Sequence, residues 1–286
     1  MAEQTPDRPA WGAWLKTIAG FVAPTTLLTG LLLFFGSGYT DAFYEYFGVD
    51  AATLSFSTQD FLLRSARPLY MPVGMTLAIG LIGAVGYISI SAMGNSRPAL
   101  PRYLRGVSLA LIVCGIALFI VGLLAGLNVW SAEALAIPLL LGGGLVLVVY
   151  GRTLRFKSTG HRYPGEVPAL AIVAAMISLC SFWAVQVYAQ ESGRYDAEYL
   201  TRHLWLRPEI VVDMAERLYL APGHAQETAL PEGGAAQHFK FRYTGLRLLA
   251  QSGNRMFVIP KGWTPARGTV MILPADTSVR VAFRPG

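Results

Sequence analysis

Charged residues are scarce in this chain. Only 14% of its 286 residues are charged and 53% are hydrophobic, whereas a soluble globular protein carries about a quarter charged residues. Five long stretches lack charge altogether, and the shortest, 134–151, would form about 27 Å of helix. The charged residues that bracket the five stretches are Lys16 and Asp41, Arg67 and Arg97, Arg105 and Glu133, Glu133 and Arg152, and Glu166 and Glu191. The sequence therefore predicts an α-helical membrane bundle with five transmembrane helices.

The sequence also lacks the residue groups that carry most chemistry. Its two cysteines, Cys114 and Cys180, both fall inside apolar stretches, where we expect small buried hydrophobes. His203, His224 and His238 do not have the spacing of metal ligands. No nucleophile–base pair and no phosphate-binding glycine loop is evident. We therefore predict a protein that is not an enzyme and binds no metal or cofactor.

Ionisable residues are missing from within the predicted spans as well. Proton-coupled pumps and transporters usually place such residues in the membrane despite the energetic cost. This absence disfavours proton-coupled transport. A passive channel or transporter component stays open as the alternative function.

Basic residues concentrate in two of the loops between spans. They are Arg97, Arg102, Arg105, Arg152, Arg155, Lys157 and Arg162. Because basic loops face the cytoplasm, these residues predict a cytoplasmic N-terminus and an extracytoplasmic C-terminus. They also account for most of the net charge of +6, so we expect no nucleic-acid partner. Aromatic residues Tyr39, Phe43, Tyr44 and Tyr46 are expected at the outer membrane interface.

The charge distribution divides the chain into three parts. Residues 1–16 form a cytoplasmic N-terminal segment, 17–190 the five-helix transmembrane domain, and 191–286 a small extracytoplasmic domain. This last domain is predicted to be β-rich (α+β), a small sandwich or partial barrel. The expected strands are 210–220, with a break near 215 and 216 left open, 239–243, 246–251, 255–260, 269–274 and 279–283. The first hairpin turns at 252–254 and the second at 275–278, whereas 221–237 reads as a polar loop.

A strong helix-start signal stands in the loop between the first two spans. Ser57 is a good N-cap with Asp60 three residues later, and Phe56 and Phe61 occupy the positions of a hydrophobic staple. The pattern predicts an outer interfacial helix near 57–67 that ends before Pro68 and Pro72. It either packs structurally over the mouth of the bundle or acts as a lid or docking helix.

Glycines recur on one face of two predicted spans. They are Gly80, Gly83 and Gly86 in the second span and Gly115, Gly122 and Gly126 in the third. Small residues at this spacing allow helices to approach closely. We expect packing within the bundle, with homo-oligomerisation through the third span as the alternative.

Two segments resemble a known group of proteins. "FGVDAATLSFSTQDFLLRS" (47–65) and "FRYTGLRLLAQSGNRMFVIPKGW" (241–263) are similar to uncharacterised actinobacterial multi-pass membrane proteins with an exported C-terminal domain. The resemblance implies a bacterial plasma-membrane protein and no particular reaction. Together with the residue patterns, it predicts a non-enzymatic interaction, scaffold or sensing subunit. Its partners would be the lipid bilayer and a protein or cell-envelope component bound by the exported domain.

Overall fold

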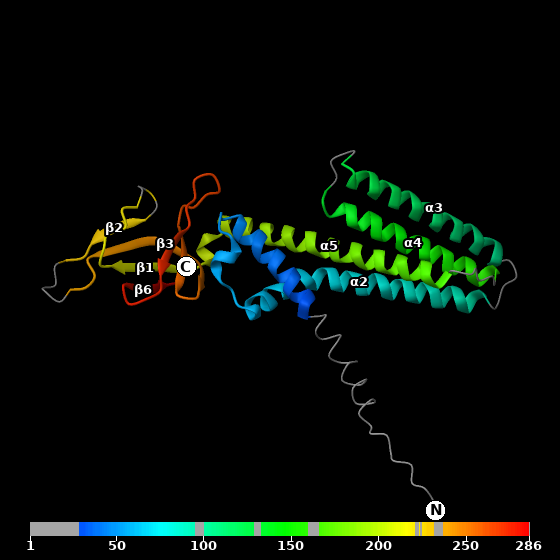
Figure 1. Ribbon diagram of the computed structural model, residues 1–286, viewed down its shortest axis with the longest axis horizontal. Helices are drawn as coiled ribbons and strands as arrows, with labels where there is room; N and C mark the ends of the chain where they lie inside the picture. Colours follow the sequence, from blue (N-terminus) through cyan, green and yellow to red (C-terminus); the bar gives the residue numbers. More distant parts are fainter. Residues whose placement is uncertain are drawn as a thin grey trace, which may run out of the picture. The chain divides into compact units, whose positions relative to one another are not determined.

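The computed structural model divides the chain into two units (Figure 1). It describes residues 29–94, 100–128, 133–159, 166–220, 223, 225–231 and 237–285. One unit, here the helical unit, is Pro68–Glu191, and the other, the sheet unit, joins the described residues up to Arg67 to those from Ser192 onward. This grouping differs from the expected domains because residues 29–67 share a core with the C-terminal sheet.

Four long helices supply the helical unit. They are α2 (Thr58–Gly94), α3 (Leu100–Gly126), α4 (Ala136–Thr159) and α5 (Glu166–Arg202), of which α2 and α5 also extend into the sheet unit. All four are long and apolar enough to cross a membrane, over Leu69–Gly86, Gly106–Gly126, Ala136–Arg155 and Pro168–Arg202. They correspond to the second to fifth predicted spans. The first predicted span covers residues 17–40, of which 17–28 lie outside the described part of the chain and 29–40 belong to a helix over 29–45 in the sheet unit.

The local sequence explains where these helices begin and which surface they present. Pro101, Pro138 and Pro168 stand in the first turns of α3, α4 and α5, where a missing N–H breaks no helical bond. None of the Leu69–Gly86 window is buried, and Leu77 and Ile82 are 69% and 72% exposed. Contiguous apolar surface of this extent is typical of a lipid-facing helix.

The predicted break before Pro68 does not occur. Helix α2 runs continuously from Thr58 to Gly94 through Pro68 and Pro72. Each proline removes one backbone donor, but membrane helices tolerate the loss when nearby groups compensate. The carbonyls that lose their donor are those of Arg64 and Pro68, four residues before each proline, and the helix continues past both positions. The segment 58–67 is therefore the first part of a long helix and not a separate interfacial helix.

The sheet unit combines short helical elements with six antiparallel strands. Its helical parts are the helix over residues 29–45, η1 (Ala51–Leu54), the end of α5 and η2 (Leu204–Leu206). The strands are β1 (Glu209–Met214), β2 (Gln226–Ala229), β3 (Phe241–Ser252), β4 (Arg255–Pro260), β5 (Met271–Pro274) and β6 (Val279–Arg284). Their order is β5-β4-β3-β1-β6, with β2 paired to β3. An α-helical and β-sheet chain with an antiparallel C-terminal sheet is thus confirmed.

One predicted hairpin is present and the other is wrong. Strands β3 and β4 pair around the expected turn, and β3 unites two segments that were predicted as separate strands. Strands β5 and β6 do not pair with each other, because β5 pairs with β4 and β6 pairs with β1. Asp276 accepts a 2.9 Å hydrogen bond from the Ser278 N–H in the link between them. A turn signal predicts the reversal of the chain but not the partner of each strand.

Strand β2 lies inside the segment predicted as a polar loop. It pairs with the first part of β3 although all four of its residues are exposed. Glu227 forms an ion pair of 2.7 Å with Arg217 and accepts a hydrogen bond from Tyr243. Backbone pairing with β3 and these polar side-chain contacts, rather than a buried apolar face, therefore hold this strand.

Two bulges curl the sheet around its own core. Strand β3 carries an extra residue opposite β1 near Gly245, whose φ is +81°, and another opposite β4 near Leu249. Bulges increase local twist and bend the strand. As a result Leu273 of β5 and Val279 of β6, at opposite ends of the strand order, join one apolar cluster with Ile210 and Val212.

A second core explains why residues 29–67 belong to the sheet unit. Buried side chains from residues 43–54, from the end of α5 and from β3 and β4 form one cluster. Its members are Phe43, Tyr44, Phe47, Val49, Leu54, Ala197, Leu200, Leu204, Leu249, Ala250, Phe257, Ile259 and Trp263. Tyr39, Phe43 and Tyr44 are thus buried and do not form the expected aromatic belt at an interface.

An ion-pair cluster lies on the three neighbouring strands β3, β1 and β6. Asp213, only 3% exposed, faces Arg242 on β3 and Arg280 on β6. Arg242 binds both carboxylate oxygens, at 2.8 and 3.0 Å, and Arg280 Nε donates to Oδ2 at 3.0 Å. These hydrogen bonds, Arg242's first, hold the pKa of Asp213 below its usual range despite burial.

Replacing Asp213 with Asn should destabilise the protein and change its acid response. A carboxyl group with a depressed pKa stabilises the fold above its unfolded pKa of about 3.9, and this stability is lost as the pH falls through the folded value. We expect Asp213→Asn to lower the free energy of unfolding by about 2 kcal/mol near neutral pH, with a smaller further loss in acid than wild type. Denaturant unfolding of the full chain in detergent, followed by tryptophan fluorescence across pH, measures both. The exposed Glu216→Gln is the control, and equal behaviour of the two variants would contradict the assignment.

Candidate functional site

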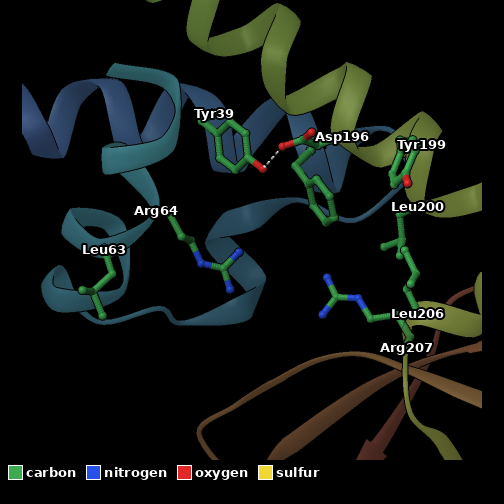
Figure 2. A pocket seen from close by; sticks show the side chains of 9 residues that line it. Tyr39, Leu63, Arg64, Asp196, Tyr199, Leu200, Leu206 and Arg207 are labelled. Carbon is green, nitrogen blue, oxygen red and sulfur yellow. Dashed lines mark hydrogen bonds between the residues drawn. The ribbon is translucent and has the colours of Figure 1, made fainter. Parts of the chain in front are cut away.

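A pocket of about 560 Å³ lies within the sheet unit (Figure 2). Its wall comes from four segments: the helix over 29–45, the start of α2, the end of α5, and the chain leading into β1. The lining residues are Tyr39, Phe43, Leu63, Arg64, Asp196, Tyr199, Leu200, Leu206 and Arg207. Aromatic and aliphatic side chains with a few charged groups are the usual lining of a ligand site.

Close backbone contacts bring the helical walls together. A Cβ added at Gly36 would overlap the carbonyl oxygen of Phe61 in α2, and one added at Gly193 in α5 would overlap that of Tyr39. Only glycine fits such helix crossings without movement of the backbone. In addition, the Tyr39 hydroxyl donates a hydrogen bond of 2.7 Å to Asp196. These contacts fix the helix over 29–45 against both α2 and α5.

The helix-start signal positions the first turns of α2. The Asp60 N–H donates to Ser57 Oγ at 3.3 Å, while the Ser57 N–H donates to Asp60 Oδ2 at 2.9 Å. This is the reciprocal capping box that the sequence predicts. The Ser57 hydrogen bonds lower the pKa of Asp60. The rings of Phe56 and Phe61 meet edge to face with centroids 6.1 Å apart, as a hydrophobic staple does.

Arg64, four residues after Asp60 in α2, contacts aromatic residues. Its Nη1 donates to the Tyr44 hydroxyl at 3.1 Å, and its guanidinium carbon lies 4.3 Å from the Phe56 ring centroid. Between these two described residues the structure shows no ion pair from Arg64 to Asp60. Cation–π contacts of this kind orient a guanidinium group without neutralising its charge.

Arg207 approaches the same pocket from the other side. It follows η2, and its backbone carbonyl accepts a hydrogen bond from Arg247 on β3. Its side chain is half-buried and extends toward Arg64 in Figure 2. No carboxylate among the described residues pairs with it. Among the described residues, the pocket lining thus includes two guanidinium groups and one carboxylate, that of Asp196.

Most residues singled out from the sequence lie elsewhere. The glycines of α3 pack against α4: an added Cβ at Gly115 would lie 2.6 Å from the Gly144 carbonyl oxygen, and one at Gly122 would lie 3.0 Å from Leu141 N. An added Cβ would lie 3.6 Å from Ile137 at Gly126 and 3.6 Å from the Tyr150 hydroxyl at Gly86. At Gly80 and Gly83 it would meet nothing within 4 Å. The face of α3 is therefore covered by α4, as expected for packing within the bundle.

The basic residues that predict topology lie at helix ends. Arg102 and Arg105 fall in the first turns of α3, and Arg152, Arg155 and Lys157 in the last turns of α4. Arg97 and Arg162 lie outside the described residues. Arg152 and Arg155, the two whose side chains the structure describes, do not line the pocket.

Ser252 Oγ donates to the Ser55 carbonyl at 3.2 Å, which gives it a structural role between η1 and the sheet. No group of three His, Cys, Asp or Glu residues in the described part of the chain could hold a metal ion. His224 lies outside that part.

Sequence reasoning missed the pocket because its residues are far apart in the chain. Neither Arg64 nor Arg207 belongs to a sequence motif that predicts a binding site. The cluster of aromatic residues over 39–47 could have indicated a buried core in this region, because so many aromatic rings close together in sequence are typical of a core. Without the fold, nothing related that cluster to residues 196–207.

Comparisons with known proteins add no functional information. No protein-family model, no curated protein and no solved structure matches the chain. The resemblance to actinobacterial membrane proteins therefore stays a prediction.

The glycine contacts that shape the pocket can be tested by adding one methyl group. Gly36→Ala should force the helix over 29–45 away from α2 and lower the free energy of unfolding by about 2 kcal/mol. Gly30→Ala is the matched control because nothing lies within 4 Å of its added Cβ, and helix propensity alone favours alanine there by about 1 kcal/mol. Thermal unfolding of both variants in the same detergent measures the difference. A Gly36→Ala protein as stable as Gly30→Ala would contradict the crossing.

Proposed function

We propose that this chain is a multi-pass bacterial plasma-membrane protein whose exported sheet unit binds a ligand or partner in the pocket. Its role is that of a non-enzymatic interaction or sensing subunit. In this proposal five helices cross the membrane, with the N-terminus in the cytoplasm and the C-terminus outside. The described residues show no feature that specifically favours the alternative, a passive channel or transporter component.

Two observations support the proposed membrane insertion and orientation. Four helices have the length and apolar composition of membrane spans, with large aliphatic side chains exposed along them. The basic residues at the start of α3 and the end of α4 favour a cytoplasmic position for those helix ends.

The observation that carries the functional proposal is the composition of the pocket wall. Leu63 and Arg64 belong to α2, and Asp196 and Tyr199 belong to α5, the two helices that extend into both units. A ligand that contacts both walls stabilises one arrangement of these two helices over others. Ligands shift conformational equilibria in this way through their differential affinity for the states.

The polar groups of the pocket suit binding better than catalysis. No serine, cysteine or histidine occurs among the described residues that line it. Asp196 accepts a hydrogen bond from Tyr39, and Arg64 donates one to Tyr44. Side chains fixed in this way hold a ligand, and they lack an activated nucleophile.

Cysteine labelling of intact cells tests both orientation and occupancy. In a background with Cys114 and Cys180 replaced by alanine, Leu206→Cys places a thiol at the pocket and Tyr219→Cys places one on exposed chain outside it. A membrane-impermeant maleimide should label Tyr219→Cys rapidly from outside. It should label Leu206→Cys slowly in cells and faster after purification, when the occupant is lost.

Two results would contradict the proposal. If neither variant were labelled until the membrane was opened, the sheet unit would face the cytoplasm. If the ratio of the two labelling rates were the same in cells and in purified protein, the pocket would have no native occupant.

A further inference from the structure

The chemical class of the pocket's occupant can be argued further; this inference rests on the proposed binding function. Two guanidinium groups, from Arg64 and Arg207, extend into one pocket from opposite walls (Figure 2). Neither forms an ion pair with a carboxylate among the described residues. Like charges that converge in a partly enclosed space repel each other, and a bound anion removes that repulsion.

Arg64 is oriented before any ligand arrives. The Tyr44 hydroxyl takes one of its donors, and the Phe56 ring supports its plane. A guanidinium group carries five N–H donors, so the others remain for a ligand. Because Tyr44 is only 1% exposed and Phe56 is packed against the same core, this orientation is built into the fold.

A third cation lies beneath the Arg207 side of the pocket. Arg247 is 4% exposed and donates to the backbone carbonyls of Trp205 and Arg207, which flank the lining residue Leu206. Its Nε has no hydrogen-bond partner in the described part of the chain. The two carbonyl oxygens accept hydrogen bonds from its Nη1, and neither carries a net charge that would neutralise the guanidinium group.

The remaining lining indicates more than a free ion. Phe43, Leu200 and Leu206 give the pocket an apolar surface, and its volume of about 560 Å³ exceeds that of an isolated anion. Asp196, the one acidic residue among the described lining residues, already accepts a hydrogen bond from the Tyr39 hydroxyl. Paired arginines match the oxygens of a phosphate group through two-pronged hydrogen bonds.

We propose that the pocket binds a phosphate ester, with its phosphate between Arg64 and Arg207 and its organic part against the apolar wall. The source of the phosphate is either a phospholipid headgroup or a soluble phosphate ester. Both present the same group to the two arginines, so the experiment must separate them.

Binding measurements on the purified full chain test the proposal. Glycerol 3-phosphate is titrated in a detergent without phosphate, and phosphatidylglycerol binding is measured by native mass spectrometry beside a diacylglycerol of equal chain length. At least one phosphate probe should bind, and the diacylglycerol should not. Arg64→Gln and Arg207→Gln should each weaken that binding at least tenfold, since each loses a charge-assisted hydrogen bond. The exposed Arg255→Gln, on β4, should leave it unchanged.

The two probes distinguish the two sources of the phosphate group. Binding of glycerol 3-phosphate supports a soluble ester, and binding of phosphatidylglycerol alone supports a lipid headgroup. Arg64→Lys and Arg207→Lys keep the charge and should fall between wild type and the Gln variants, which guards against simple misfolding. Failure of both probes, or binding that the Gln variants retain, would overturn the phosphate assignment. It would not affect the labelling test, which detects an occupant of any class.

Discussion

The structure of the sheet unit depends on one docking event, the packing of the helix over 29–45 against α2 and α5. Backbone contacts at Gly36 and Gly193 allow the close approach, and the hydrogen bond from Tyr39 to Asp196 joins residues 157 positions apart. This docking brings residues 43–54 onto β3 and β4, where they complete a buried core. The pocket is formed by the same contacts. Loss of the docking would expose the aromatic residues of that core and separate Arg64 from Arg207.

The arginines show how strongly the partners of a residue decide its role. Arg242 and Arg280 share the carboxylate of Asp213 and stabilise the sheet. Arg247 is buried against backbone carbonyls. Arg64 and Arg207 have no acidic partner among the described residues and face a cavity. Composition alone gives these five residues one description, a basic excess. Arg64 and Arg207 combine a place on the pocket wall with no ion pair among the described residues, which suits them to attract an anionic ligand.

The sequence predicted features that depend on neighbours in the chain. Uncharged stretches predicted four of the helices, and the pattern from Phe56 to Phe61 predicted the start of α2. Features that depend on distant pairing were missed. The four residues between β5 and β6 signal a reversal, yet the strands pair at opposite ends of the sheet. Pro68 and Pro72 suggested a break because proline disfavours helix continuation in soluble proteins, whereas membrane helices tolerate it. The pocket was not predicted because Arg64 and Arg207 line the same cavity only in the folded sheet unit, in which the helix over 29–45 packs against α2 and α5.

A double-mutant cycle between Tyr39 and Asp196 tests the docking most directly. Tyr39→Phe and Asp196→Asn each remove one partner of the hydrogen bond, and the double variant removes both. If the two helices dock as described, the free energies of unfolding should show a coupling of about 1 kcal/mol between the sites. Strictly additive effects of the two substitutions would mean that the side chains do not meet, and the shared core and the pocket would both be contradicted.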